Sequence, residues 1–345
     1  MKKVLDKKLF FSMTMDFLTV YVPQDSASQK TVKAYRDGLT IFRRYMINEK
    51  HLSIREFTFE KCSFDLILEY RNWLMDDQQK AKSTVNNRLS SIKAYLHYAA
   101  AKDVTLQQVQ LNISEVPFLK VPKKIRPIIE DNNTLQALLD APPNTKVGCR
   151  DVMILSVLFD TMIRAEELIQ LDIKDVQIEA EIPFMLIHGK GNKERTVPLS
   201  PEVIPLIKAY LAEYHGDKVS RNQPFIYTKQ HETIHRMSER NVERVVKKYA
   251  DKIRADHPDL PSTVYPHMLR RTRGTGLYRD GVAMEAIAVA MGHASIQTTK
   301  DHYAFPSLAQ KKEVMNAGGS IVASGKEEQE WPDDEEELAR ICGLR

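Results

Sequence analysis

Apolar residues in the first hundred positions recur at three- and four-residue steps, the period of an amphipathic helix. Residues 31–46 show this period in a stripe formed by Val32, Tyr35, Leu39, Phe42, Tyr45 and Met46. Ser63 and Ser83 stand where helix N-caps are expected, before helices that run to Met75 and Ala101. The pattern therefore predicts a bundle of about four helices at the N-terminus.

The last helix of this bundle, residues 83–101, has one apolar face and one polar face. The predicted buried stripe consists of Val85, Leu89, Ile92, Leu96 and Ala99. The residues expected elsewhere on its surface are Asn87, Arg88, Ser91 and Lys93. A small helical bundle of any function has this pattern, so the helices alone do not identify a partner.

Residues 116–127 break the helical pattern with three prolines and four bases, Lys120, Lys123, Lys124 and Arg126. Proline disfavours helix and favours an extended path, so this stretch is predicted to be an interdomain linker whose bases could lie along phosphates. Beyond it, short alternating runs over residues 176–199 predict one small antiparallel sheet. Helices are predicted at residues 133–139, 152–171, 201–214, 238–253, 267–280, 284–291 and 307–315.

Composition and charge narrow the class of protein. With 345 residues, 43% of them hydrophobic, the chain is expected to fold as two globular domains. Its apolar runs are too short for a membrane helix, and the N-terminus lacks the features of a signal peptide, so a cytoplasmic protein is expected. Three widely spaced cysteines favour neither a disulfide framework nor a zinc site.

Charge is distributed unevenly between the body of the chain and its end. Residues 321–345 hold eight acids and three bases, a net charge of −5, whereas the whole chain carries +4. The preceding residues therefore carry +9, which suits a polyanionic partner without proving one.

The strongest chemical signal lies between residues 267 and 303. His267 and Arg270 are three residues apart and share one helical face, so both can point at a single anion. His293 follows in MGH, and Tyr303 stands ten residues after it. A tyrosine hydroxyl can act as a lasting covalent nucleophile.

Read together with Arg164 in TMIRAEEL and Lys190 in IHGKGNKERTVPL, these motifs resemble the tyrosine recombinase family, which includes phage integrases, Xer recombinases and transposon integrases. The resemblance implies a mainly α fold with two domains. A helical, SAM-like core-binding domain is expected over residues 1–112, and a basic linker over 113–128. A mostly α catalytic domain with a small antiparallel sheet is expected over 129–318, and an acidic tail over 319–345.

The resemblance also assigns roles around a scissile phosphate. Two arginines would hold its non-bridging oxygens through bidentate hydrogen bonds, and the family's pattern places them at Arg164 and Arg270. His267 is the candidate general base for Tyr303, and His293 would bind a phosphate oxygen or support the same proton transfer. Lys190 matches the family's general acid, with Lys193 as the alternative. Glu167 either orients Arg164 through an ion pair or is an ordinary surface acid.

Two positions depart from the family's usual pattern. Met162 stands where the family commonly has glycine, two residues before its first arginine, which leaves the local turn in question. The step from His293 to Tyr303 is ten residues, whereas nine is common in the family.

The expected activity is DNA strand transfer through a 3′-phosphotyrosyl link, without ATP, metal or cofactor. The implied partners are double-stranded DNA with inverted-repeat sites and a homotetramer on two sites, which could include related recombinase subunits; no membrane is expected. The DNA-contacting candidates are Asn87, Arg88, Lys93, Lys123 and Lys124. A mobile-element integrase or transposase is favoured over a chromosomal Xer-like resolvase.

Three alternatives remain open at this point. A type IB topoisomerase would share the chemistry, an architectural or regulatory DNA-binding protein would have lost it, and a helical scaffold would have no relation to DNA. The acidic tail is predicted to dock on a neighbouring subunit through a short helix over residues 335–341; autoinhibition over the DNA groove and a solubilising tail are the alternatives.

Overall fold

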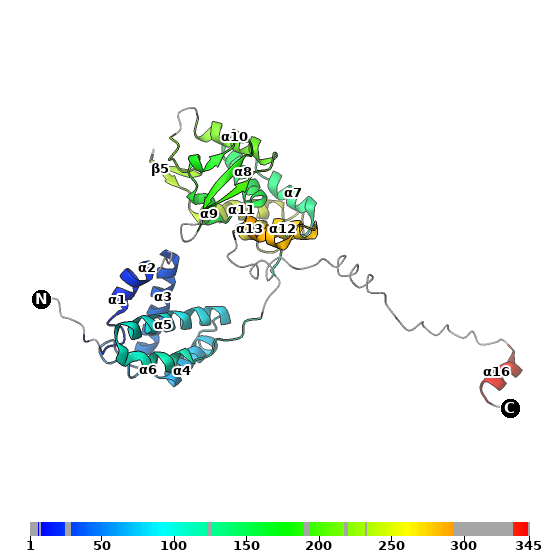
Figure 1. Cartoon of the computed structure of the whole chain (residues 1–345). Coiled ribbons are helices and arrows are strands. Elements are labelled where there is room, and N and C mark those ends of the chain that lie inside the picture. The colour runs from blue at the N-terminus through cyan, green and yellow to red at the C-terminus, as the bar shows by residue number, and fades with distance from the viewer. Residues whose placement is uncertain are drawn as a thin grey trace. The chain divides into compact units, whose positions relative to one another are not determined.

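The computed structural model describes residues 6, 8–24, 29–122, 126–189, 194–216, 220–231, 233–292 and 334–343. The chain divides into two compact units, Met1–Lys124 and Ile125–Arg345, and each contains a hydrophobic core. Helices dominate both units, as Figure 1 shows, so the predicted mainly α fold class is confirmed. None of the described helices has the length and apolar character that a membrane span requires.

Within the described part of the first unit, a three-part helical segment comprises α1 (Thr14–Asp16), a π-helical turn (Phe17–Tyr21) and α2 (Val22–Gln24). Four longer helices follow it: α3 (Gln29–Asn48), α4 (Phe64–Asp76), α5 (Lys82–Lys102) and α6 (Gln107–Ser114). The core is rich in aromatic rings around Phe10, whose ring lies 4.9–5.5 Å from those of Phe42, Phe57, Phe59 and Tyr95. The Tyr95 hydroxyl donates a hydrogen bond to the Phe10 carbonyl and so ties the N-terminal segment to α5.

One of the two predicted caps in this unit is confirmed and the other is wrong. The Ser63 hydroxyl accepts the Leu66 N–H at 3.2 Å and caps α4. Helix α5 begins at Lys82, so Ser83 already lies in its first turn. Ala81 is the N-cap, with an extended backbone whose carbonyl accepts the N–H groups of Thr84 and Val85.

The predicted apolar stripe of α5 is buried, but Ser91 is buried as well and does not lie on the surface. The reason is the close approach of α3. A Cβ added to Gly38 of α3 would lie 2.2 Å from the Ser91 hydroxyl oxygen. The hydroxyl donates to the Asn87 carbonyl at 3.0 Å, so its burial leaves no polar group unsatisfied.

The second unit contains helices around a central α8 and two small sheets (Figure 1). Its helices are α7 (Asn132–Asp140), α8 (Lys146–Asp160), α9 (Ala165–Gln170), α10 (Val203–Tyr214), α11 (Glu239–Ile253), α12 (Pro266–Arg279) and α13 (Met284–Met291). Helix α8 contacts α7, α10, α11 and α12, and its middle residues Met153–Leu158 are buried or nearly so. A further helix, α16 (Glu335–Ile341), matches the predicted tail helix, whereas the helix predicted at 307–315 lies outside the described residues.

The predicted sheet consists of β1 (Val176–Gln177), β2 (Phe184–His188) and β3 (Glu194–Pro198), antiparallel in chain order. A second sheet was not predicted. It is the hairpin of β4 (Tyr227–Gln230) and β5 (Thr233–Arg236). All four residues of β5 are exposed, so this hairpin has no apolar alternation that a sequence pattern could detect.

A single helix predicted over residues 152–171 is wrong, because the chain breaks into α8 and α9. Thr145 starts α8 earlier than predicted, with its hydroxyl accepting the Gly148 N–H at 3.1 Å. The break occurs at Met162, whose φ of 53° is left-handed and ends the helix. Arg164 is then extended, with φ −75° and ψ 150°, and forms the N-cap of α9.

Candidate active site

Arg164 stands at the start of α9, where Glu167 binds it twice. The Arg164 N–H donates to Glu167 Oε2 at 2.8 Å, and Arg164 Nη1 donates to Oε1 at 2.8 Å. Glu167 is buried, so it is not an ordinary surface acid, whereas the Arg164 side chain is 42% exposed. The N-cap position therefore holds the arginine backbone while its guanidinium keeps access to solvent.

A second arginine, which the sequence reasoning missed, completes this cluster. Arg195 of β3 donates from Nη1 to Glu167 Oε1 at 3.1 Å and from Nη2 to Oε2 at 2.8 Å. A signal for it existed in the strand pattern: Arg195 shares the inward face of ERTVP with the buried Val197. A base on the buried face of a strand requires an acidic partner.

Glu167 carries its negative charge in spite of its burial. Burial by itself raises the pKa of this carboxyl. Hydrogen bonds from Arg195 and from the Arg164 N–H, together with the charges of both arginines, lower the pKa by more than burial raises it. The net result is a pKa below the ordinary glutamate value, so Glu167 is ionised at neutral pH.

Arg270, predicted to bind phosphate, lies on α12 and is fully buried. Its Nη1 donates to the Met162 carbonyl, and its Nη2 donates to the Met291 carbonyl at 2.8 Å. Arg270 thus joins the turn that precedes Arg164 to the end of α13, which precedes His293.

His267 lies on the first turn of α12 after Pro266, among positive charges. Burial, followed by the charges of Arg270, Arg271, Arg164 and Arg126, lowers the pKa of His267 to about 4. The imidazole is therefore neutral at pH 7 and can accept a proton. The positive charges around it also favour an anion at this place.

The His267 pKa gives a testable prediction. In the free protein its imidazole is expected to titrate near pH 4 and not near 6.5, because burial and the arginines disfavour its charged form. Duplex DNA should raise this pKa, since a nearby phosphate stabilises the imidazolium. The measurement is an NMR titration of the histidine Cε1–H signals, with His267→Gln to assign the resonance. An unchanged pKa on saturation with DNA would show that no phosphate lies near the ring.

Three predicted catalytic residues, Lys190, His293 and Tyr303, lie outside the described residues. The elements that flank two of them are described. Lys190 belongs to the connection between His188 and Glu194, which are paired as the last residue of β2 and the first of β3. His293 directly follows Gly292, the left-handed C-cap of α13, with φ 65°.

Met162, the residue that stands in place of the family's usual glycine, adopts the left-handed conformation that glycine adopts readily. For a residue with a Cβ this conformation costs roughly 1–2 kcal/mol. The Met162 side chain is buried in a small cluster with Ile287 and Met291, and burial of a methionine contributes about 1.5–3 kcal/mol. Packing against α13 thus offsets the strain, and the turn retains the form that glycine would give.

The candidate DNA contacts of the first unit differ in their accessibility. Asn87 is exposed and Arg88 is half-buried. Lys93 donates to the carbonyls of Ser114 at 2.9 Å and Val116 at 2.6 Å, and burial lowers its pKa. Its ammonium group is thus engaged by the end of α6 and the residues that follow. Lys123 and Lys124 lie outside the described residues.

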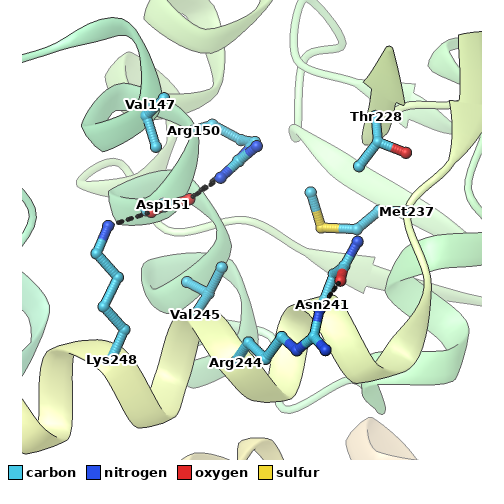
Figure 2. Close-up of a pocket in the computed structure, with 9 residues that line it drawn as sticks. All are labelled: Val147, Arg150, Asp151, Thr228, Met237, Asn241, Arg244, Val245 and Lys248. Carbon is cyan, nitrogen blue, oxygen red and sulfur yellow. Dashed lines mark hydrogen bonds and ion pairs between the residues drawn. The ribbon is translucent and has the colours of Figure 1, made fainter. Parts of the chain in front are cut away.

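A separate hollow of about 210 Å³ lies between α8, α11 and β4, and none of its lining residues belongs to the predicted catalytic set. Figure 2 shows Asp151 between Arg150 and Lys248 along its wall, and Arg244 beside Asn241. Asp151 is buried and accepts Arg150 Nη2 at 2.6 Å and the Tyr249 hydroxyl at 2.7 Å. With three bases and one acid around Val147, Met237 and Val245, this pocket, called the α8–α11 pocket below, is apolar with a positive rim.

Comparison with known proteins agrees with this geometry. Residues 130–308 match the model of the phage integrase family, and residues 10–113 match that of the phage integrase SAM-like domain. The chain is 29% identical to a tyrosine recombinase XerD of Staphylococcus haemolyticus in an alignment 315 residues long that covers 87% of this chain and 96% of that protein. It is 26% identical to XerD of Oceanobacillus iheyensis, over 83% of this chain and 91% of that protein.

Solved structures show the same fold at lower identity. The pre-cleavage complex of the XerH site-specific recombinase with its difH substrate has a TM-score of 0.62 at 19% identity and covers 88% of this chain and 83% of that one. The Tn1549 transposon integrase with circular intermediate DNA has a TM-score of 0.60 at 19% identity, over 88% of this chain and 99% of that one. Because the family model covers more than half of the residues, the chain belongs to the phage integrase family, the tyrosine recombinases, which are DNA strand-exchange enzymes.

Proposed function

We propose that this chain is a site-specific recombinase that cuts and rejoins double-stranded DNA through a 3′-phosphotyrosyl link on Tyr303. The observation that carries the proposal is the cationic site around the neutral His267, to which Arg164, Arg270, Arg271 and Arg126 contribute charge. Such a site favours a phosphate, and it holds a base that is unprotonated at neutral pH.

The roles proposed for the site follow from its chemistry. Arg164 and Arg270 stabilise the charge that develops on the phosphate oxygens, and His267 takes the proton of Tyr303. A phenol with a pKa of about 10 is ionised to only about 0.1% at neutral pH, so a base is needed. Lys190 protonates the leaving 5′ oxygen, and His293 supports the phosphate. Neither metal nor ATP enters this scheme, because the covalent link conserves the energy of the bond that breaks.

We propose a mobile element as the biological setting, with integration, excision or transposition as the outcome. The acidic tail supports this setting, because it lies beyond residue 308, where the match to the phage integrase family model ends, and so extends the chain past the catalytic domain. The Xer relatives favour the alternative, a chromosomal Xer-like resolvase. A DNA-binding protein without catalysis is disfavoured by the intact set of predicted catalytic residue types in the sequence.

The test is cleavage of nicked suicide duplexes, in which loss of a short fragment traps the covalent complex. Duplexes tiled across the DNA that flanks the coding region are compared with the host's chromosome-dimer resolution site. The proposal expects a covalent adduct on one set, formed at the same rate in excess chelator. Cleavage that requires added magnesium would contradict the mechanism, and cleavage only at the resolution site would select the Xer-like alternative.

DNA binding should depend steeply on salt, since phosphate contacts release counterions.

The proposed assembly is a homotetramer on two inverted-repeat sites, in which related recombinase subunits could also take part. The α8–α11 pocket offers a place for the tail of a neighbouring subunit. Arg150 and Lys248 on its rim pair with Asp151, and Arg244 adds a further base, so the rim has a net positive charge that complements the three acids at the start of α16. Ile341 on α16 is 58% exposed.

Truncation after Gly319 tests this docking. Single-site DNA binding should stay nearly intact, whereas synapsis and recombination should fall, because the tail would join subunits and not contact DNA. The measurements are a gel-shift titration and a two-site recombination assay, with Arg244→Glu in the full-length chain as the matched change in the pocket. Undiminished recombination by the truncated chain would reject docking, and tighter DNA binding would support autoinhibition.

A further inference from the structure

Arg195 connects three segments that carry predicted catalytic residues. It stands at the second position of β3, shortly after Lys190 in the chain, and its guanidinium binds Glu167 beside Arg164. It also lies against the turn before His293. A Cβ added to Gly292 would be 2.8 Å from the guanidinium carbon of Arg195. Glycine at position 292 thus allows both the left-handed C-cap and the close approach of Arg195.

The hydrogen bonds on Glu167 show what Arg195 does to Arg164. Each carboxylate oxygen accepts two bonds: Oε1 from Nη1 of both arginines, and Oε2 from the Arg164 N–H and Arg195 Nη2. An ionised carboxylate has about four acceptor sites, so these bonds fill it. Arg195 takes the bidentate geometry, and Arg164 is left with a single side-chain bond to Glu167.

Removing Arg195 would change this balance. Without Arg195 the buried Glu167 carboxylate would have two unfilled acceptor sites. New hydrogen bonds to it would be favourable, because an unsatisfied buried charge is costly. The nearest arginine is Arg164, whose fork could turn to pair with both oxygens. Its guanidinium would then face the protein and not the solvent-exposed side that a phosphate approaches.

We propose that Arg195 is a positioning residue for strand cleavage: by saturating Glu167 it keeps the Arg164 fork available for the scissile phosphate, and it packs against Gly292 at the end of α13. The inference rests on the proposed recombinase function. Among the described residues, Arg195 contacts the site through Glu167 and Gly292, so its effect appears chiefly in the rate of the chemical step and not in DNA affinity.

The experiment measures single-turnover adduct formation on a saturating suicide duplex, together with DNA affinity and thermal stability. Arg195→Met should slow adduct formation by about ten- to a hundredfold, the loss that a small displacement of a catalytic group causes. DNA affinity should change by no more than a fewfold, because the only proposed phosphate contact that is displaced is that of Arg164. Arg195→Lys, which keeps the charge but has a single donor nitrogen, should have a rate between those of Arg195→Met and the unchanged protein.

A double variant separates positioning from general damage. In Arg195→Met with Glu167→Gln the buried charge is gone, so Arg164 is no longer drawn inward, and much of the lost rate should return. The pH profile is a second readout. Loss of Arg195 removes a cause of the low Glu167 pKa, so in Arg195→Met protonation of Glu167 should release Arg164, and the rate deficit relative to the unchanged protein should shrink as the pH falls; the double variant should not show this change.

Arg279→Gln is the matched control, because Arg279 lies at the far end of α12 in an exposed pair with Glu130. It should keep the rate of the unchanged protein. An unchanged rate in Arg195→Met, or losses that simply multiply in the double variant, would overturn the inference. If Arg195→Met does not fold, Arg195→Lys decides, and a rate equal to that of the unchanged protein overturns the inference. Absence of an adduct with the unchanged protein would instead reject the proposed function.

Discussion

Tyr303→Phe is expected to bind DNA with unchanged affinity and to form no covalent adduct on a nicked duplex. Phenylalanine keeps the ring but lacks the oxygen that would attack the phosphate, so the effect is complete loss and not a reduction. The assay is denaturing electrophoresis of labelled suicide DNA, run beside a gel-shift titration that confirms binding. This is the largest effect that the proposed mechanism predicts.

His302→Ala is the matched control for this change. His302 adjoins Tyr303 in the sequence but has no counterpart among the family's motifs, so its loss should leave the adduct in place. Adduct formation by Tyr303→Phe would show that another residue is the nucleophile. Loss of the adduct in His302→Ala with normal folding would give His302 a role that the motifs do not predict.

Arg270→Lys is expected to slow cleavage by a factor on the order of 10²–10³, the usual cost of losing one preorganised donor at a developing charge. The structure adds a second reason. Arg270 spans the carbonyls of Met162 and Met291 with two nitrogens, and a lysine ammonium has only one. The turn before Arg164 and the end of α13 would lose their common anchor, so the melting temperature should fall as well.

Arg279→Lys on the same helix controls for the change of residue type. Arg279 pairs with Glu130 at the surface, where an ammonium can replace a guanidinium at small cost. The measurements are time courses of adduct formation, which give the cleavage rate, and thermal melts, which give the melting temperature, for both variants. Cleavage by Arg270→Lys within a fewfold of the unchanged rate would mean that Arg270 supplies only positive charge at a distance.

Helix periodicity predicted much of this fold because it depends on residues close in sequence. Ser63 is the N-cap that local spacing predicted, with its hydroxyl accepting the Leu66 N–H. The helix predicted from residue 238 begins at Glu239, and Ser238 is its N-cap, with its hydroxyl accepting the Asn241 N–H. Ser83 has the same residue type but failed as a cap, because α5 starts at the extended Ala81. The break at Met162 also escaped prediction, since it depends on packing against Ile287 and Met291, more than a hundred residues away.

The residues of the candidate site likewise include some that local sequence predicted and some that it did not. His267 and Arg270 were found because one helical turn separates them, and motif spacing placed Arg164 and Glu167 together. Arg195 was missed because its partner lies 28 residues earlier on another element, and no local pattern specifies that contact. The backbone contacts of Arg270 were likewise invisible, since Met162 and Met291 meet only in the folded unit.

The most direct test of the central claim is to identify the residue that is linked to DNA. The adduct from the unchanged protein would be trapped on a suicide duplex in excess chelator, then digested with nuclease and trypsin for mass spectrometry. The proposed mechanism predicts a nucleotide remnant on the peptide of residues 301–311, in which Tyr303 is the only tyrosine. A remnant on any other peptide, or cleavage without a covalent protein–DNA link, would contradict it.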